Sequence, residues 1–281
     1  MNIAVLSGKG GTGKTLVSVN LAAVAKKATY IDCDVEEPNG HIFFKPKEIK
    51  ARTVSIKIPV VDEKDCKGCR KCVDFCNFNA LAYTNKLKIF EEICHSCGGC
   101  KLVCAENAIK EKDKKIGEIQ IGTSDQVEVI TGVLDTGEAS GVPIINELIK
   151  HTSLREEINI IDCPPGSACI VMESIKDADY CVLVTEPTVF GVHNMKMVYE
   201  LIKLFNKPHG AVINKYISEE INLAELFCLD NDINILQRIP FDYELGKLNS
   251  NGKIVSKEFQ EYKNLFSSLL EKITKEVLYA T

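Results

Sequence analysis

The stretch from Ser7 to Thr15, Ser-Gly-Lys-Gly-Gly-Thr-Gly-Lys-Thr, constrains the fold of this chain more than any other. It follows a short apolar run, Ile3 to Leu6, and precedes a segment, Leu16 to Val24, whose apolar residues recur at helical spacing. A strand, a glycine-rich turn and a helix in this order suit a phosphate-binding loop, because backbone N–H groups and the helix N-terminus then face the anion. The sequence therefore predicts a P-loop nucleotide site at the start of an α/β domain.

Six residues of this loop are assigned to nucleotide binding: Gly10, Gly11, Thr12, Gly13, Lys14 and Thr15. We expect Lys14 to reach the β- and γ-phosphates of ATP or ADP and to act in catalysis, and the Thr15 hydroxyl to bind Mg²⁺. A second lysine, Lys9, lies inside the loop, where the standard pattern does not require one. A glycine-rich turn without a ligand is the alternative, and the complete G-x-x-x-x-G-K-T pattern disfavours it.

Acidic residues end two further apolar runs, Thr29 to Asp34 and Ile158 to Asp162. Because ligands of an open α/β sheet bind at the carboxyl ends of its strands, we expect these acids to lie beside the phosphates. One of Asp32 and Asp34 would hold Mg²⁺ through water while the other orients or deprotonates the attacking water, and Asp162 would also hold Mg²⁺ through water. Ordinary acids at strand ends are the alternative. Magnesium is assigned to Thr15, Asp34 and Asp162.

The remaining apolar runs predict a doubly wound, mainly parallel sheet with helices on both faces. The expected strands are Arg52–Val61, Ile116–Ile121, Val127–Val133, Tyr180–Thr185, Ala211–Asn214 and Ile233–Ile239. A helix is expected over Val142–Ile149, whereas Val35–Lys50 is typical of a loop. Asn214 and Pro240, at the ends of the last two strands, are assigned to nucleotide binding, since the Asn214 amide could read the adenine edge.

The C-terminal stretch Glu258–Leu278 is amphipathic, with Lys and Glu balanced on its polar side. It predicts a helix that covers the sheet, and a membrane-surface helix is the alternative. The net charge of −5 gives no evident basic face, so no nucleic-acid partner is expected. The chain opens directly into a strand and lacks a run of transmembrane length, so we expect a cytoplasmic protein without a signal peptide or a membrane partner.

Thirteen cysteines are many for a chain expected in a reducing compartment, where they favour metal binding over disulfides. Eight of them repeat the spacing C-x₂-C-x₂-C-x₃-C, which is typical of bacterial two-cluster ferredoxins, whose fourth cysteine ligates the other cluster. Two structural zinc sites are the alternative, which the crossed fourth ligands disfavour. One 4Fe–4S cluster is therefore assigned to Cys66, Cys69, Cys72 and Cys104, and the other to Cys94, Cys97, Cys100 and Cys76.

The cysteine block divides the chain into a discontinuous nucleotide-binding domain, residues 1–61 and 114–281, and a small α+β insert, residues 62–113. The insert also resembles the ferredoxin family in the residues that follow each fourth cysteine, Asn79-Ala80-Leu81 and Asn107-Ala108-Ile109. It departs from that family at Asn77 and Ala105, where the family has proline.

Taken together, Ser7–Thr15, Asp34, Asp162–Gly166 and Asn214 resemble the MinD/ParA superfamily of P-loop ATPases, which includes the nitrogenase iron protein and the Mrp-type iron–sulfur carriers. Lys9 gives the loop the Lys-Gly-Gly-x-Gly-Lys-Thr form, which is the deviant Walker A motif of that group. With its cysteine block, the chain looks like the MinD-superfamily ATPases that carry an inserted two-cluster ferredoxin domain.

The resemblance implies a nucleotide-sandwich homodimer in which Lys9 crosses to the partner's phosphates. It also implies that Asp34 activates water, that Asp162 serves Mg²⁺ and a switch, and that Asn39 belongs to the first switch. In the nitrogenase iron protein two cysteines per subunit lie at the dimer seam, and Cys169 falls where one of them lies. We expect Cys169 to be a packed small residue rather than a ligand.

The leading functional hypothesis is a slow, partner-stimulated ATPase whose nucleotide state gates electron transfer through the two clusters. The first alternative is an ATP-dependent iron–sulfur assembly or carrier protein, for which the clusters are cargo. The second is a non-redox regulatory switch like the ParA relatives, with structural clusters. The sequence does not name the redox or apo-protein partner.

Overall fold

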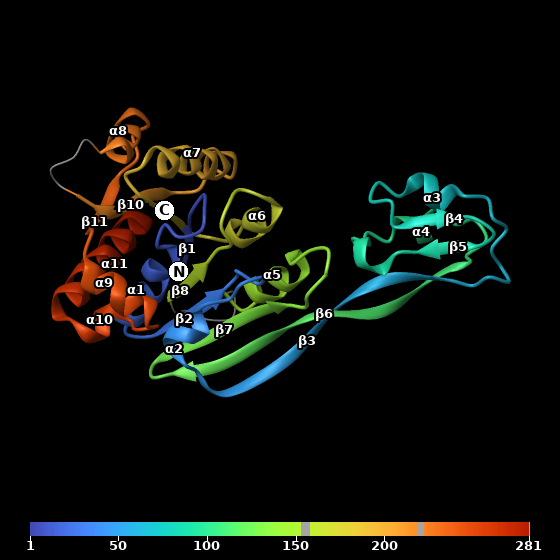
Figure 1. Cartoon of the computed structure of the whole chain (residues 1–281), viewed down its shortest axis with the longest axis horizontal. Helices are drawn as coiled ribbons and strands as arrows, with labels where there is room; N and C mark the ends of the chain where they lie inside the picture. The colour runs from blue at the N-terminus through green and yellow to red at the C-terminus, as the bar shows by residue number, and fades with distance from the viewer. Residues whose placement is uncertain (153–157, 218–221, 281) are drawn as a thin grey trace.

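The computed structural model describes residues 1–152, 158–217 and 222–280 and contains an α/β body with a small unit beside it (Figure 1). The strands are β1 (Asn2–Leu6), β2 (Ala28–Asp32), β3 (Lys47–Val61), β4 (Leu81–Tyr83), β5 (Leu87–Ile89), β6 (Ile109–Ser124), β7 (Val127–Leu134), β8 (Ile158–Asp162), β9 (Tyr180–Thr185), β10 (His209–Tyr216) and β11 (Ile235–Pro240). The helices are α1 (Lys14–Val24), α2 (Gly40–Phe44), α3 (Lys71–Phe75), α4 (Gly99–Leu102), α5 (Val142–Ile149), α6 (Cys169–Ile175), α7 (Val189–Leu204), α8 (Leu223–Asp230), α9 (Tyr243–Ser250), α10 (Val255–Glu258) and α11 (Gln260–Ala280), with a 3₁₀ turn η1 (Glu91–Ile93).

The body is built on a nine-stranded sheet in the order β11-β10-β9-β1-β8-β2-β7-β6-β3. The strands from β11 to β7 run parallel, whereas β6 is antiparallel to both β7 and β3. In register, Asp162 lies opposite both Val5 and Asp32, so β1, β8 and β2 end at the same edge. This edge is where a parallel α/β sheet binds its ligands, and the predicted mainly parallel sheet is confirmed.

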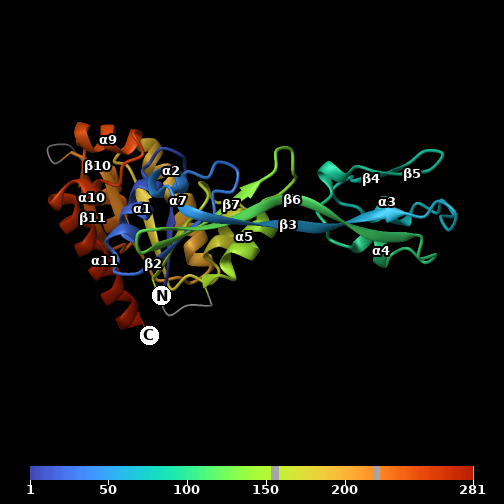
Figure 2. The same cartoon turned by 90° about the horizontal axis from the view of Figure 1, so that it is seen from below.

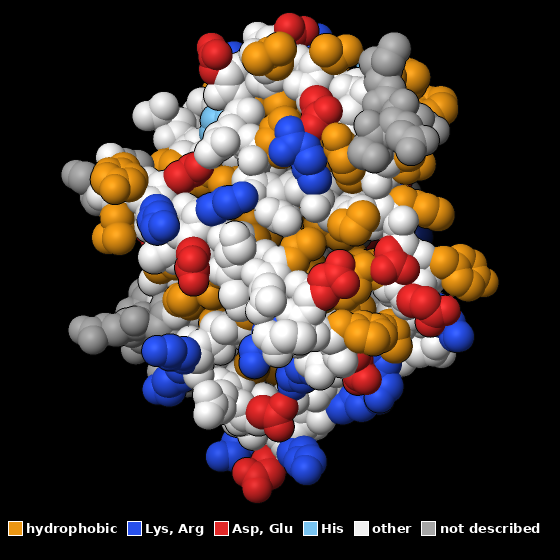
Figure 3. All heavy atoms as spheres, turned by 90° about the vertical axis from the view of Figure 1, so that its left-hand side faces the viewer, with side chains coloured by type: hydrophobic (Ala, Val, Ile, Leu, Met, Phe, Trp, Pro, Cys, Tyr) orange, Lys and Arg blue, Asp and Glu red, His pale blue; other side chains and the backbone are white. Residues whose placement is uncertain are grey.

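Helices cover both faces of the sheet, as Figure 1 shows. One face packs against α5, α6 and α7 and the other against α1, α9, α10 and α11, and each interface has its own hydrophobic core. The C-terminal helix α11 buries Tyr262, Phe266, Leu269 and Ile273, which confirms that it covers the sheet. Its outer surface belongs to the face in Figure 3, where acidic and basic side chains are interspersed with apolar ones. In the described parts of the chain, every helix is too short or too polar to cross a membrane.

The prediction of a loop over Val35–Lys50 was partly wrong. This stretch contains the short helix α2 and the first residues of β3. The helix forms because Phe44 is buried against Tyr30, with ring centroids 5.0 Å apart. Five residues are too few to show helical periodicity in a sequence.

The strands β3 and β6 extend beyond the sheet as a two-stranded ribbon that carries residues 62–108 at its tip (Figures 1 and 2). The pairing continues to Val61 opposite Ile109. A bulge between Val54 and Ser55 marks the point where the ribbon leaves the sheet, opposite Gly117 with φ +158. The small unit has a core of its own that includes Ile58 and Ile109 from the ribbon.

Candidate functional site

The glycine-rich loop between β1 and α1 depends on glycine at one position in particular. Gly13 precedes α1 with φ +99, a left-handed conformation that other residues rarely adopt. A Cβ atom at this position would lie 2.1 Å from Asn214 Nδ2, and the Asn214 amide donates to the Thr12 carbonyl at 2.8 Å. The end of β10 therefore holds the loop in shape, and the assignment of Asn214 to adenine stays a prediction.

Lys14, at the start of α1, is buried against Asp162 at the end of β8. Lys14 Nζ lies 2.5 Å from Asp162 Oδ1, and the two side chains are 7% and 1% exposed. Ser18 Oγ donates to the same oxygen at 3.0 Å, and the Tyr30 hydroxyl donates to Oδ2 at 2.7 Å. Burial would lower the pKa of Lys14, but the charge and hydrogen bond of Asp162, with the charges of Asp32 and Asp34, together raise it. In the unliganded chain the loop lysine is therefore charged and paired with the acid assigned to Mg²⁺.

The two acids that follow β2 differ in their surroundings. Asp32 is buried, and its carboxylate accepts the backbone N–H groups of Asp34, Asn39 and Gly40 at 3.2, 3.0 and 2.8 Å. Burial and then the charge of Asp162 raise the pKa of Asp32 to about 7. Asp32 was expected beside the phosphates, but the structure commits its carboxylate to the backbone of the loop before α2.

A hollow of about 300 Å³ lies beside the glycine-rich loop, and Lys14, Thr15, Asp34 and Pro165 are among the residues that line it. Burial raises the pKa of Asp34 to about 6, although the charge of Lys14 opposes the rise. The structure thus brings the glycine-rich loop, Asp34 and Pro165, which lies in the Pro164-Pro165-Gly166 turn after β8, to one space. Pro240 ends β11 along the same edge of the sheet, and its role at the nucleotide stays a prediction.

Lys9, the additional lysine of the loop, forms an ion pair with Glu186, which follows β9. The Glu186 side chain is 9% exposed and also pairs with Lys215 Nζ at 3.0 Å, while Lys215 donates to the Gly11 carbonyl at 3.1 Å. Burial would raise the pKa of Glu186, but the hydrogen bonds and charges of Lys9 and Lys215 together lower it. Sequence reasoning did not identify Glu186 or Lys215 as site residues, although Glu186 follows β9 and Lys215 lies near the end of β10, both at the ligand edge.

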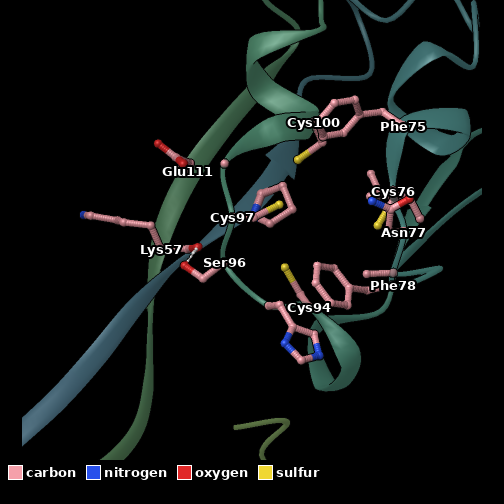
Figure 4. Close-up of a pocket in the computed structure, with 15 residues that line it drawn as sticks. Lys57, Phe75, Cys76, Asn77, Phe78, Cys94, Ser96, Cys97, Cys100 and Glu111 are labelled. Carbon is pink, nitrogen blue, oxygen red and sulfur yellow. Dashed lines mark hydrogen bonds between the residues drawn. The ribbon is translucent and has the colours of Figure 1, made fainter. Parts of the chain in front are cut away.

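Two hollows in the small unit are each lined by four cysteines. Each hollow takes three thiols from one repeat and the fourth thiol from the other repeat. One is lined by Cys66, Cys69, Cys72 and Cys104, and the other by Cys76, Cys94, Cys97 and Cys100. Figure 4 shows the second hollow, where the four sulfur atoms point toward a common space beside Phe75 and Phe78.

The two repeats share their backbone conformation as well as their spacing. Residues at three matching positions have positive φ: Gly68 and Ser96, Arg70 and Gly98, and Asn79 and Asn107. Four of these six residues are not glycine, although residues other than glycine seldom adopt positive φ. The first two pairs flank the second cysteine of each repeat, where they turn the chain so that successive thiols face one hollow.

The donor set fits a cluster better than a hard cation, because thiolates are soft ligands that favour iron–sulfur clusters, zinc and copper. The second hollow is also lined by apolar side chains, including Pro59, Ala80 and Leu81. Among the residues that the structure describes, no three His, Cys, Asp or Glu side chains are arranged to hold a single metal ion. The cluster assignments therefore stay predictions that agree with the lining of both hollows.

Cys169 was expected to be packed, and this expectation was wrong. Cys169 is exposed, because it begins α6 on the surface directly after the turn that follows Asp162. The other four cysteines outside the small unit, Cys33, Cys163, Cys181 and Cys228, are buried.

Comparison with known proteins identifies the family. Residues 3–255 match the model of the CobQ/CobB/MinD/ParA nucleotide binding domain, and this chain belongs to that family. Two uncharacterised proteins of Methanocaldococcus jannaschii are each 33% identical to it, over 96% and 84% of this chain and 97% and 88% of their own lengths. An iron–sulfur cluster carrier protein of the same organism is 23% identical over 96% of this chain and 84% of the carrier.

Solved structures show the same fold. The cell division ATPase MinD of Pyrococcus furiosus superposes with a TM-score of 0.60 at 21% identity, covering 98% of both chains. MinD of Pyrococcus horikoshii, solved in complex with Mg-ADP, gives a TM-score of 0.59 at 19% identity, covering 97% of this chain and 95% of its own. The predicted MinD/ParA-type P-loop fold is thereby confirmed.

Proposed function

We propose that this chain is an ATP-hydrolysing iron–sulfur protein whose nucleotide state controls electron transfer through two 4Fe–4S clusters. The observation that carries the proposal is that one chain holds a P-loop site and two cysteine-lined hollows, joined by a ribbon. The ribbon strand β3 begins shortly after Asp34 and α2, on the segment that lines the nucleotide hollow. Movement of that segment would therefore act on the ribbon and on the unit at its tip.

In the cluster unit, residues 62–113 form an inserted ferredoxin-like domain within the ATPase domain of residues 1–61 and 114–281. The thiols of Cys66, Cys69, Cys72 and Cys104 hold one cluster, and those of Cys94, Cys97, Cys100 and Cys76 hold the other. When bound, the clusters supply one-electron chemistry at a potential that the surrounding protein sets. Apolar side chains line part of both hollows, whereas Cys69 and Cys97 are exposed to solvent.

In the nucleotide site, Lys14 leaves Asp162 and neutralises the transferred phosphoryl group, while Thr15, Asp34 and Asp162 hold Mg²⁺ directly or through water. Asp34 orients the attacking water. The chain acts as a nucleotide-sandwich homodimer in which Lys9 completes the partner's site. Because Glu186 holds Lys9 in the single chain, hydrolysis is slow until a partner favours the closed dimer.

The test uses anaerobic protein with both clusters reconstituted. We would measure cluster reduction potentials and electron-transfer rates with ADP, with a non-hydrolysable ATP analogue and without nucleotide. The proposal expects both quantities to change with the nucleotide. Identical values in all three states, in protein shown to bind both nucleotides, would contradict it.

A second function is favoured by the relative named as an iron–sulfur cluster carrier protein. In that case this chain would deliver its clusters to an apo-protein under the control of ATP. Transfer of a cluster to an apo-ferredoxin, followed by absorbance, would support the carrier function, and clusters that stay bound with every nucleotide would support electron transfer.

A further inference from the structure

Lys114 lies on the ribbon between the body and the cysteine unit and contacts both. Its Nζ lies 2.9 Å from Glu138 Oε2, in the loop between β7 and α5. The same ammonium donates to the Glu91 carbonyl in η1 of the cysteine unit at 3.1 Å. The Lys114 and Glu138 side chains are 17% and 14% exposed, whereas the Lys57–Asp113 pair on the same ribbon is 59% and 66% exposed. The Lys114–Glu138 ion pair is therefore better shielded from solvent than the Lys57–Asp113 pair.

The loop that carries Glu138 is tied to the nucleotide site. It follows β7, whose last residue Leu134 donates its N–H to the Val35 carbonyl at 2.9 Å, and Val35 is the neighbour of Asp34. At the other end of the loop, a Cβ on Gly141 would lie 2.4 Å from Val35 Cγ2. In Figures 1 and 2 the loop reaches toward the cysteine unit. Both ends of the loop therefore contact Val35, which gives a physical path from the nucleotide site to the loop.

The other end of the contact leads to a cysteine hollow. Glu91 begins η1, which is followed directly by Cys94, one of the four thiols of the second hollow. Lys112 reinforces the position of Glu91 by pairing with its carboxylate at 2.7 Å. The segment that Lys114 holds is therefore the segment that presents Cys94 to its hollow.

We propose that Lys114 is a positioning residue that transmits the state of the nucleotide site to the second cysteine hollow, through Glu138 on the body and Glu91 on the cysteine unit. This inference rests on the proposed control of the clusters by nucleotide. It adds a specific route through side-chain contacts to the coupling that the ribbon strands could provide by themselves.

The first experiment needs no nucleotide. In anaerobic, cluster-loaded protein, amide hydrogen exchange would be followed in peptides covering residues 91–96 and 135–141. Loss of one charge-assisted hydrogen bond should raise exchange about tenfold in both peptides of Lys114→Met. The matched control Lys110→Met, which removes the exposed pair with Asp62 from the same strand, should raise neither, and Lys114→Arg should keep the wild-type protection. Unchanged exchange in both peptides of Lys114→Met would overturn the inference.

The second experiment adds Mg²⁺ and a non-hydrolysable ATP analogue. In the wild type, exchange over 91–96 and the reduction potential of the second cluster should respond to the analogue, while in Lys114→Met and Glu138→Gln only residues 135–141 should respond. A wild-type response over 91–96 in both variants would overturn the route through Lys114. A wild type in which the exchange, the potentials and the electron-transfer rates all fail to respond would refute the proposed function, and the first experiment would still decide whether Lys114 joins the two parts.

Discussion

The buried pair of Lys14 and Asp162 leads to a quantitative prediction for the unliganded protein. Replacement of Lys14 by Met leaves the Asp162 carboxylate, 1% exposed, with the hydroxyls of Ser18 and Tyr30 as its remaining donors. Removing one partner of a buried ion pair costs about 3–5 kcal/mol. Since two donors remain, we expect the lower end, about 3 kcal/mol, which corresponds to a fall in Tm of roughly 6–12 °C for a domain of this size.

The assay is thermal unfolding in EDTA without nucleotide, on cluster-loaded protein, for Lys14→Met, Asp162→Asn and the double variant. The double variant should be more stable than the sum of the two losses predicts, with a coupling energy of about 2–3 kcal/mol, because it buries no unpaired charge. The control is Lys57→Met, whose exposed pair with Asp113 should contribute only about 0–1 kcal/mol. A loss below about 1 kcal/mol for Lys14→Met, together with simple additivity, would refute the reasoning.

Three further predictions follow from the same structure. Because the pKa of Asp32 is raised from 3.8 to about 7, the folded, metal-free protein keeps a proton that the unfolded chain loses, so stability in EDTA should fall as the pH rises from about 4 to about 7. In urea unfolding, the free energy of unfolding of Asp32→Asn should depend less on pH than that of the wild type. A wild-type stability that rises over this pH range would contradict the raised pKa of Asp32. If Cys76 and Cys97 serve one cluster, a variant with both changed to Ser should lose no more iron than Cys76→Ser alone, whereas Cys76→Ser with Cys69→Ser should lose the iron of both clusters in metal analysis. Glu186→Gln should weaken the hold on the loop lysine and raise both ATP-dependent dimerisation in sedimentation and the basal ATPase rate, and a rate at or below that of the wild type would count against an inhibitory contact.

The central sheet was predictable because its parallel strands are buried on both faces and therefore appear in the sequence as continuous apolar runs. β8 and β9 occupy the predicted residues, Ile158–Asp162 and Tyr180–Thr185, since both are almost wholly buried. The first part of β3 is different. Residues Lys47–Ala51 are exposed and carry no apolar alternation, so they form a strand only because β6 supplies hydrogen-bond partners. A partner far along the chain cannot be inferred from local pattern.

Within the site, a motif predicts which residues gather and does not predict what each side chain contacts. The loop and Asp34 gather at one hollow as expected. The Asp32 carboxylate, however, accepts hydrogen bonds from the backbone N–H groups of Asn39 and Gly40. These contacts depend on the path of the loop before α2, which no sequence pattern predicts. Glu186 was missed because a single acid after a strand is common, and its importance depends on the ion pair with Lys9.

The ribbon of β3 and β6 leaves the sheet at the bulge of Val54 and Ser55, opposite Gly117, so this bulge would be the fulcrum of any rotation of the cysteine unit. From the bulge to Val61 the ribbon spans roughly seven residues at about 3.3 Å each, an arm of ~20 Å. A tilt of about 10° at the fulcrum would therefore carry its tip through ~4 Å, since an arc is the product of arm and angle. That displacement exceeds the length of a hydrogen bond, so a small rotation at the body can make or break a contact between the distant unit and another protein.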